Sequence, residues 1–163
     1  MSPRAAWRLE SIGFTQVYDY VAGKADWGSF GLPLEGTKGA RAGEHVRADV
    51  PTCRLEERLQ DVRHQVSAAG WDTCIVVNEH RVVLGRLGRK ALAMEEDVAV
   101  EAVMTAGPST VRPSITLAAI VERMRNQNLT NLPVTTSDGR LVGLLRLEDA
   151  ESAIRDKRDS ASA

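Results

Sequence analysis

Apolar residues in the C-terminal third of the chain follow two patterns, and each pattern predicts a different kind of element. Leu117, Ile120 and Met124 recur at helical spacing, which predicts a helix with one buried face. Two short apolar runs then flank Asp138 and Gly139, which predicts a β-hairpin because glycine accepts the positive φ of a tight turn. The predicted unit is β-α-β-β-α, with strands at 109–112, 131–135 and 140–145 and helices at 115–126 and 147–154.

The same order of elements occurs twice. Shifting the sequence by 58 residues superposes Thr52 on Thr110, Arg54 on Arg112, Leu59 on Leu117, Val76 on Val134, Gly85 on Gly143 and Leu87 on Leu145. A shared register of this length indicates a duplicated unit. In the first copy it predicts helices at 55–69 and 89–94 and strands at 73–78 and 82–87.

The remaining segments set the boundaries of the two copies. The segment 37–46 has glycines and no apolar periodicity, which predicts a linker. The end of the chain, 157–163, is polar and is expected to fray. We therefore place repeat 1 at 47–95 and repeat 2 at 96–156.

Repeat 2 resembles a CBS domain, the module named after cystathionine β-synthase. The resemblance lies in the Val-Met-Thr lead-in, the Pro-x-Thr-Val strand, the Leu-Pro-Val strand and the Asp-Gly-Arg-Leu-Val-Gly hairpin. Together with the duplication it implies a tandem CBS pair, or Bateman module, with an α/β (α+β) fold of two packed repeats. Such pairs are regulatory and non-enzymatic, and they bind AMP, ADP, ATP or S-adenosylmethionine in clefts between the repeats.

The same resemblance implies a ligand site in the second repeat. Asp149 stands where the family binds ribose, whereas Arg146 replaces the usual Thr or Ser and supplies a cation for phosphate. Thr110 is expected at phosphate or ribose, and Pro133 and Val134 along the adenine base. The alternative is that Asp149 is a helix N-terminal acid and Arg146 a solvated cation.

The first repeat lacks both anchors. Gly88 and Ala91 stand at the positions of Arg146 and Asp149, although Thr52 is retained. We therefore expect this cleft to be empty or to serve only as a structural mate. The basic residues nearby are interpreted as a solvated helix face, with phosphate binding as the alternative; they are Arg86, Arg89 and Lys90.

Residues 1–36 resemble the C-terminal end of a rhodanese domain, which implies a short αβα remnant. The landmarks are the Arg-Ala-Ala helix up to Glu10, Gly13, the strand 17–20, Gly23, Trp27 and Gly31-Leu32-Pro33. In that family a catalytic cysteine precedes this helix, and here the first cysteine is Cys53. Sulfurtransferase activity is therefore not expected; a truncated sulfurtransferase, or a gene start upstream, is the weaker alternative.

The aromatic residues of this segment are expected to pack against another surface, either on the pair of repeats or on a second chain. They are Trp7, Phe14, Tyr18, Tyr20 and Trp27. This expectation agrees with a homodimer. A structural or dimerisation module with a decayed ligand site is the alternative to a nucleotide sensor.

Composition narrows the function classes further. The net charge is −1, with 21 basic and 22 acidic residues, so neither nucleic acid nor an anionic membrane is an expected partner. The sequence has no apolar run long enough to span a membrane and no signal peptide, which predicts a cytoplasmic protein. Cys53 and Cys74 are expected to be reduced and buried. No metal site and no required cofactor is predicted, because His45, His64 and His80 lack partners at ligand spacing.

Overall fold

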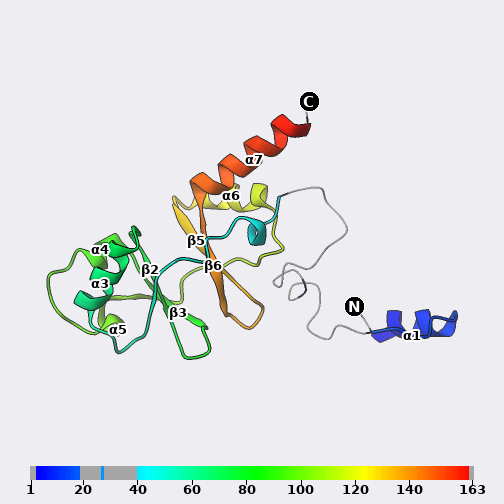
Figure 1. Ribbon diagram of the computed structural model, residues 1–163, viewed down its shortest axis with the longest axis horizontal. Helices are drawn as coiled ribbons and strands as arrows, with labels where there is room; N and C mark the ends of the chain where they lie inside the picture. The colour runs from blue at the N-terminus through cyan, green and yellow to red at the C-terminus, as the bar shows by residue number, and fades with distance from the viewer. Residues whose placement is uncertain (1–2, 19–26, 28–39, 162–163) are drawn as a thin grey trace.

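The computed structural model of this chain describes residues 3–18, 27 and 40–161. Figure 1 shows two groups of elements side by side, with the helices of the left-hand group on its outer side and those of the right-hand group above its strands. The green elements on the left belong mainly to repeat 1, and the yellow to red elements on the right belong to repeat 2.

Repeat 1 is built on a four-stranded sheet in the order β1-β2-β3-β4. Strand β1 is parallel to β2, and the other neighbours are antiparallel. The elements are β1 (Thr52–Cys53), α3 (Leu59–Ala68), β2 (Cys74–Val77), β3 (Val83–Leu87), α4 (Arg89–Leu92), α5 (Val100–Val103) and β4 (Thr105–Ala106). Since α5 and β4 come from the start of repeat 2, the first sheet is completed by a segment of the second repeat.

Repeat 2 has the antiparallel pair β5-β6, and its helices lie above these strands in Figure 1. Its elements are α6 (Leu117–Asn126), β5 (Asn131–Thr135), β6 (Leu141–Arg146) and α7 (Leu147–Ala161). Single bridges extend the pair at both edges, Val111 with Val134 and Arg47 with Leu144. The short helix η1 (Ala42–Glu44) lies upstream of repeat 1 but packs on repeat 2.

The pairing confirms the duplication and the predicted fold class. The parallel pair Cys53 and Val76 recurs 58 residues later as Val111 and Val134. Both hairpins also shift register at equivalent places, after Val76 and after Val134. The segments that lead into the two repeats, 40–47 and 98–106, are exchanged: the first packs on repeat 2, and the second packs on repeat 1.

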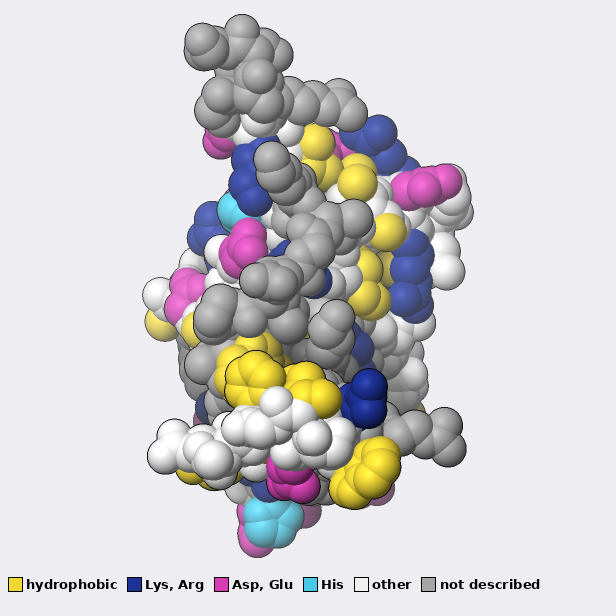
Figure 2. Space-filling model, turned by 90° about the vertical axis from the view of Figure 1, so that its right-hand side faces the viewer, with side chains coloured by type: hydrophobic (Ala, Val, Ile, Leu, Met, Phe, Trp, Pro, Cys, Tyr) yellow, Lys and Arg dark blue, Asp and Glu magenta, His cyan; other side chains and the backbone are white. Residues whose placement is uncertain are grey.

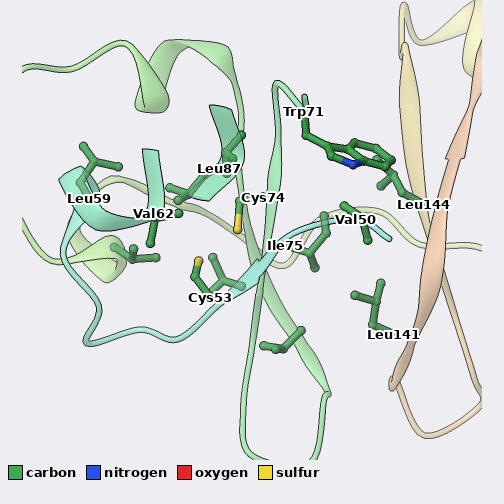
Figure 3. Packing of buried hydrophobic residues seen from close by; sticks show 14 residues of the cluster. Val50, Cys53, Leu59, Val62, Trp71, Cys74, Ile75, Leu87, Leu141 and Leu144 are labelled. Carbon is green, nitrogen blue, oxygen red and sulfur yellow. The ribbon is translucent and has the colours of Figure 1, made fainter. Parts of the chain in front are cut away.

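The two repeats share part of one core. Leu141 and Leu144 of repeat 2 belong to the same buried cluster as Trp71 and Ile75 of repeat 1. Figure 3 shows the Trp71 ring lying toward Leu144 across this boundary. At the hairpin tips, the backbone of Val82 bridges that of Arg140. The repeats are therefore held together by apolar burial and by backbone pairing.

Two helices begin later than predicted because of the exchanged segments. The predicted helices at 55–69 and 115–126 start at Leu59 and Leu117. The N–H of Leu59 donates to the carbonyl of Val98 at 3.0 Å, and that of Leu117 donates to Ala40 at 2.8 Å. These first helical N–H groups lack an intrahelical acceptor, so the exchanged segments satisfy them. The strand predicted at 109–112 is reduced to one bridge, at Val111.

The structure differs from two further expectations. Ala40 and Ala42, in the predicted linker 37–46, are buried in the core of repeat 2. The last helix, predicted at 147–154, continues to Ala161, so the segment 157–161 is helical although a frayed tail was predicted. No glycine or proline lies between 155 and 161 to end the helix.

Helix α1 (Pro3–Ser11) and the residues that follow it carry exposed apolar side chains. Trp7, Ile12, Phe14 and Tyr18 are all more than half exposed. Figure 2, which faces the end of the molecule that bears α1, shows hydrophobic side chains at its surface. Gly13, with φ +101°, follows the helix as predicted. Of the predicted strand 17–20, the first two residues are not in a strand and the others, with Tyr20, lie outside the described residues. The rhodanese-like arrangement stays a prediction.

In the part of the chain that the structure describes, no helix is both long and apolar enough to cross a membrane.

Candidate functional site

The corner between β6 and α7 carries the two polar residues predicted to bind ligand. Arg146 ends β6 and is paired with Asn131 on β5, and Asp149 lies in the first turn of α7. Although they are one turn apart, the two side chains have different partners. Arg146 contacts repeat 1, whereas Asp149 contacts the segment that leads into repeat 1.

Arg146 stacks on an aromatic ring of the other repeat. Its guanidinium carbon lies 4.2 Å from the ring centre of Trp71, within the range of a cation–π interaction. Its Nη1 also lies 3.6 Å from Oε1 of Glu148. Only 26% of the Arg146 side chain is exposed. Arg146 is therefore a half-buried contact between the repeats, and the interpretation of a fully solvated cation does not describe it.

Asp149 forms an ion pair with Arg47. The Arg47 Nε donates to Oδ2 of Asp149 at 2.8 Å, and Nη2 donates to Oδ1 at 3.5 Å. The hydrogen bond and the charge of Asp149 raise the pKa of the Arg47 guanidinium above its usual value. The Asp149 side chain is 28% exposed and that of Arg47 is 44% exposed. The carboxylate predicted to bind ribose thus has a partner within the chain.

Arg47 is held in place by its backbone. Its N–H donates to the carbonyl of Leu144 at 2.9 Å, and the N–H of Leu144 donates back at 3.0 Å. A Cβ on Gly143 would lie 2.6 Å from the carbonyl oxygen of Arg47, so this close approach requires glycine. The backbone of Arg47 is therefore fixed against β6, and its side chain reaches Asp149.

Two hollows flank this corner. The larger, of about 500 Å³, lies between the repeats and is lined by Gly70, Trp71, Asp72, Arg89, Thr130, Asn131, Arg146, Leu147, Glu148 and Glu151. The smaller, of about 360 Å³, is lined by His45, Asp149, Ser152, Ala153, Asp156 and Lys157. Arg146 and Asp149 therefore face different hollows.

The other three predicted site residues line neither of these hollows. Thr110 is partly exposed and precedes the single bridge at Val111. Pro133 and Val134 are buried in β5, and Val134 has no exposed surface. The carbonyl of Pro133 accepts a hydrogen bond from Val111 at 3.0 Å. The assignment of these residues to the base and phosphate stays a prediction.

A larger hollow lies at the equivalent place of repeat 1, and residues of both repeats line it. Its volume is about 630 Å³, and it is lined by Asp72, Thr73, Arg86, Gly88, Arg89, Lys90, Ala91, Met94, Ala102, Val103, Thr105, Thr130 and Asn131. Two of its cations have partners: Arg86 donates to the Asn131 side chain at 2.9 Å, and Arg89 pairs with Asp72 at 2.5 Å. Since Arg86 bonds across to repeat 2, it is not part of a solvated helix face.

Sequence reasoning missed two residues of this site, Arg47 and Trp71. A usable signal existed for Arg47, because the 58-residue register extends upstream and places it on Thr105. In the same register Ala40 and Ala42 match Val98 and Val100, which are apolar residues of the other lead-in segment. No local sequence pattern predicts that Trp71 lies against Arg146.

The two cysteines are free and buried, as predicted. A hydrogen bond with Cys53 and burial raise the pKa of the Cys74 thiol. Figure 3 shows both sulfurs inside the core of repeat 1. Within the described ranges, no group of three or more His, Cys, Asp or Glu side chains is placed to hold a metal ion.

Residues 100–156 match the CBS domain family. Three solved structures show how far the likeness extends. The CBS domain pair of protein MJ0100, in complex with 5′-methylthioadenosine and S-adenosyl-L-methionine, is 19% identical with a TM-score of 0.64, covering 73% of this chain and 98% of that one. CBSX2, a CBS-pair protein of Arabidopsis thaliana, in complex with AMP, is 18% identical with a TM-score of 0.65, covering 74% and 99%.

The third is the cytosolic domain of the Mg²⁺ channel MgtE in complex with ATP. It is 22% identical with a TM-score of 0.64, covering 69% of this chain and 48% of that one. This chain therefore corresponds to about half of the MgtE structure. Taken together, the likenesses show that the chain has the fold of a tandem CBS pair.

Proposed function

We propose that this CBS pair is a non-enzymatic, cytoplasmic regulatory module that binds an adenosine-containing ligand of the AMP, ADP or ATP class. The site would be the second-repeat cleft, at the corner of β6 and α7. One observation carries the proposal: Arg146 lines a hollow of about 500 Å³ to which both repeats contribute. A ligand bound there would contact the two repeats at once.

Two guanidiniums are available to a phosphate at this place, although three carboxylates also line the hollow and two of them pair with these guanidiniums. Arg146 and Arg89 both line the hollow, and Asn131 offers an amide. A guanidinium binds phosphate through charge-assisted hydrogen bonds, which are stronger than neutral ones. In this proposal Arg146 leaves Trp71, or tilts on it, to bind phosphate. The ring of Trp71 remains on the wall of the hollow.

The ribose and base contacts follow from the family resemblance. Asp149 would accept hydrogen bonds from the ribose hydroxyls, Thr110 would bind phosphate or ribose, and Pro133 and Val134 would line the base. S-adenosylmethionine would be an alternative ligand of the same kind. No cofactor is required.

The regulatory output would arise from the shared site. A ligand shifts a conformational equilibrium only if it binds two states with different affinity. Because the hollow has walls from both repeats, a change in their spacing alters the ligand contacts. The change would pass to a homodimer partner, or to the segment that bears Trp7 and Phe14.

A second function, in another class, is a structural or dimerisation module with a decayed site. The Arg47–Asp149 ion pair favours it, because the ribose-binding carboxylate is already occupied. The exposed side chains of Trp7, Phe14 and Tyr18 also suit a protein partner. This alternative predicts assembly that depends on concentration, with no ligand effect.

Ligand-dependent unfolding distinguishes the two functions. The purified chain is heated with and without millimolar AMP, ADP, ATP or S-adenosylmethionine, and calorimetric titration measures affinity directly. Ligand at about 100 times its dissociation constant adds about 2.7 kcal/mol of stability. We expect a shift for wild type and for the control Asp138→Ala, whose carboxylate lies on the exposed hairpin, and no shift for Asp149→Ala. Absence of binding by every ligand would contradict the proposed function.

A further inference from the structure

The two repeats differ at one equivalent place, and the difference concerns Arg47. In repeat 1 one hollow of about 630 Å³ is lined by Gly88, Ala91 and Thr105 together. In repeat 2 the counterparts are Arg146, Asp149 and Arg47, at the same 58-residue offset. There the space is divided into two smaller hollows, one lined by Arg146 and the other by Asp149.

The side chains at the equivalent positions differ in charge. Ala91 and Thr105 cannot form an ion pair. Asp149 and Arg47 pair through two hydrogen bonds, at 2.8 and 3.5 Å. The long Arg47 side chain thus covers the carboxylate on which the proposed ribose contact depends.

We propose that Arg47 closes the second-repeat site of the ligand-free chain by holding Asp149, and that a ligand must displace it to bind. This inference rests on the proposed function, since it requires a ligand that uses Asp149. Arg47 is then a regulatory residue of that site, because it lowers ligand affinity without taking part in binding.

The geometry allows Arg47 to act as such a latch. Its backbone is fixed by two hydrogen bonds to Leu144 and by the close approach to Gly143. Its side chain is 44% exposed, so it can turn into solvent without moving the sheet. The latch therefore opens by side-chain rotation alone.

The expected effect is modest because the ion pair is partly solvated. Pairs of this kind contribute little to stability, so ligand must overcome only a small competing interaction. We expect removal of the Arg47 charge to tighten ligand binding by about two- to fivefold. Added salt should reduce this gain, since it screens the ion pair.

The test compares AMP affinity by calorimetric titration across matched variants. Arg47→Met removes the charge and keeps a long apolar stem. Arg140→Met is the control, since Arg140 forms an ion pair of 2.9 Å with Asp138 on the hairpin. Asp149→Ala and the double variant Arg47→Met/Asp149→Ala test whether the gain requires the Asp149 carboxylate. Thermal unfolding without ligand confirms that each variant is folded.

We expect Arg47→Met to bind AMP more tightly than wild type, Arg140→Met to be unchanged, and the gain to vanish in the double variant. The ratio between Arg47→Met and wild type should fall toward one between about 0.05 and 0.5 M salt. Equal or weaker binding by Arg47→Met would overturn the latch and leave the proposed function intact. If no variant binds AMP, ADP, ATP or S-adenosylmethionine, both proposals fail.

Discussion

The guanidinium of Arg146 lies 4.2 Å from the ring centre of Trp71, and this contact joins the last strand of repeat 2 to repeat 1. Trp71 itself is buried, with 8% of its surface exposed. The ring therefore presents one face to the core and another to a cation at the rim of the hollow. Changes at the candidate site should reach the interface between the repeats through this pair.

The first prediction concerns that contact. We expect Arg146→Gln to lower the free energy of unfolding by about 0.5–1 kcal/mol, since a partly exposed cation–π interaction is lost. The emission of Trp71 should also change. Urea unfolding and fluorescence in a Trp7→Phe/Trp27→Phe background, where Trp71 is the single tryptophan, would measure both. Unchanged stability and emission would contradict a role for the contact.

The second prediction separates the two clefts. Lys90 lines the hollow of repeat 1 but does not line the hollow that contains Arg146. If AMP binds at the second-repeat corner, Arg146→Gln should weaken binding by about tenfold, the effect of losing a charge-assisted hydrogen bond. Lys90→Gln should leave the affinity unchanged. If titrations show instead that Lys90→Gln weakens binding and Arg146→Gln does not, the ligand binds in the hollow of repeat 1.

The third prediction concerns the glycine beneath Arg47. A Cβ at Gly143 would lie 2.6 Å from the Arg47 carbonyl oxygen and 3.2 Å from Cβ of Val46. We expect Gly143→Ala to cost about 1–3 kcal/mol, because the lead-in segment must move off β6. The control is Gly88→Ala, whose Cβ meets only the flexible end of Arg86 at 3.6 Å and which should cost less than about 1 kcal/mol. Chemical denaturation would compare the two; equal costs would argue against a tight approach.

The fourth prediction is a pH dependence. The hydrogen bond with Cys53 and burial raise the pKa of Cys74 in the folded chain. In the unfolded chain this thiol should titrate near its ordinary value of about 8.5. Above that pH the unfolded chain loses a proton that the folded chain keeps, so stability falls as pH rises, by about 1.4 kcal/mol per unit.

Urea unfolding with a reductant between about pH 8 and 10 would check this slope. The loss of unfolding free energy per pH unit should be smaller for Cys74→Ala than for wild type, by the contribution of about one proton. Identical slopes in the variant and wild type would show that Cys74 does not make this contribution.

Much of the fold follows from local patterns in the chain. The helical spacing around Ile120 and the turn at Gly139 placed the helix and hairpin of repeat 2, and β5 has the bounds that were predicted for it. The shift of 58 residues identified the duplication, which the strand pairings confirm. These features are readable because periodicity and turn chemistry depend on neighbours close in sequence.

The partners of the candidate site residues depend on contacts between distant segments. Arg47 and Asp149 are 102 residues apart, and Arg146 meets Trp71 from the other repeat. A hydrophobic pattern states which face of an element is buried, but not which remote side chain lies opposite its polar residues. The exchange of the lead-in segments and the packing of the two sheets determine which remote side chains lie there. The sequence alone predicted that Asp149 binds a ligand, and only the packed structure shows its ion pair with Arg47.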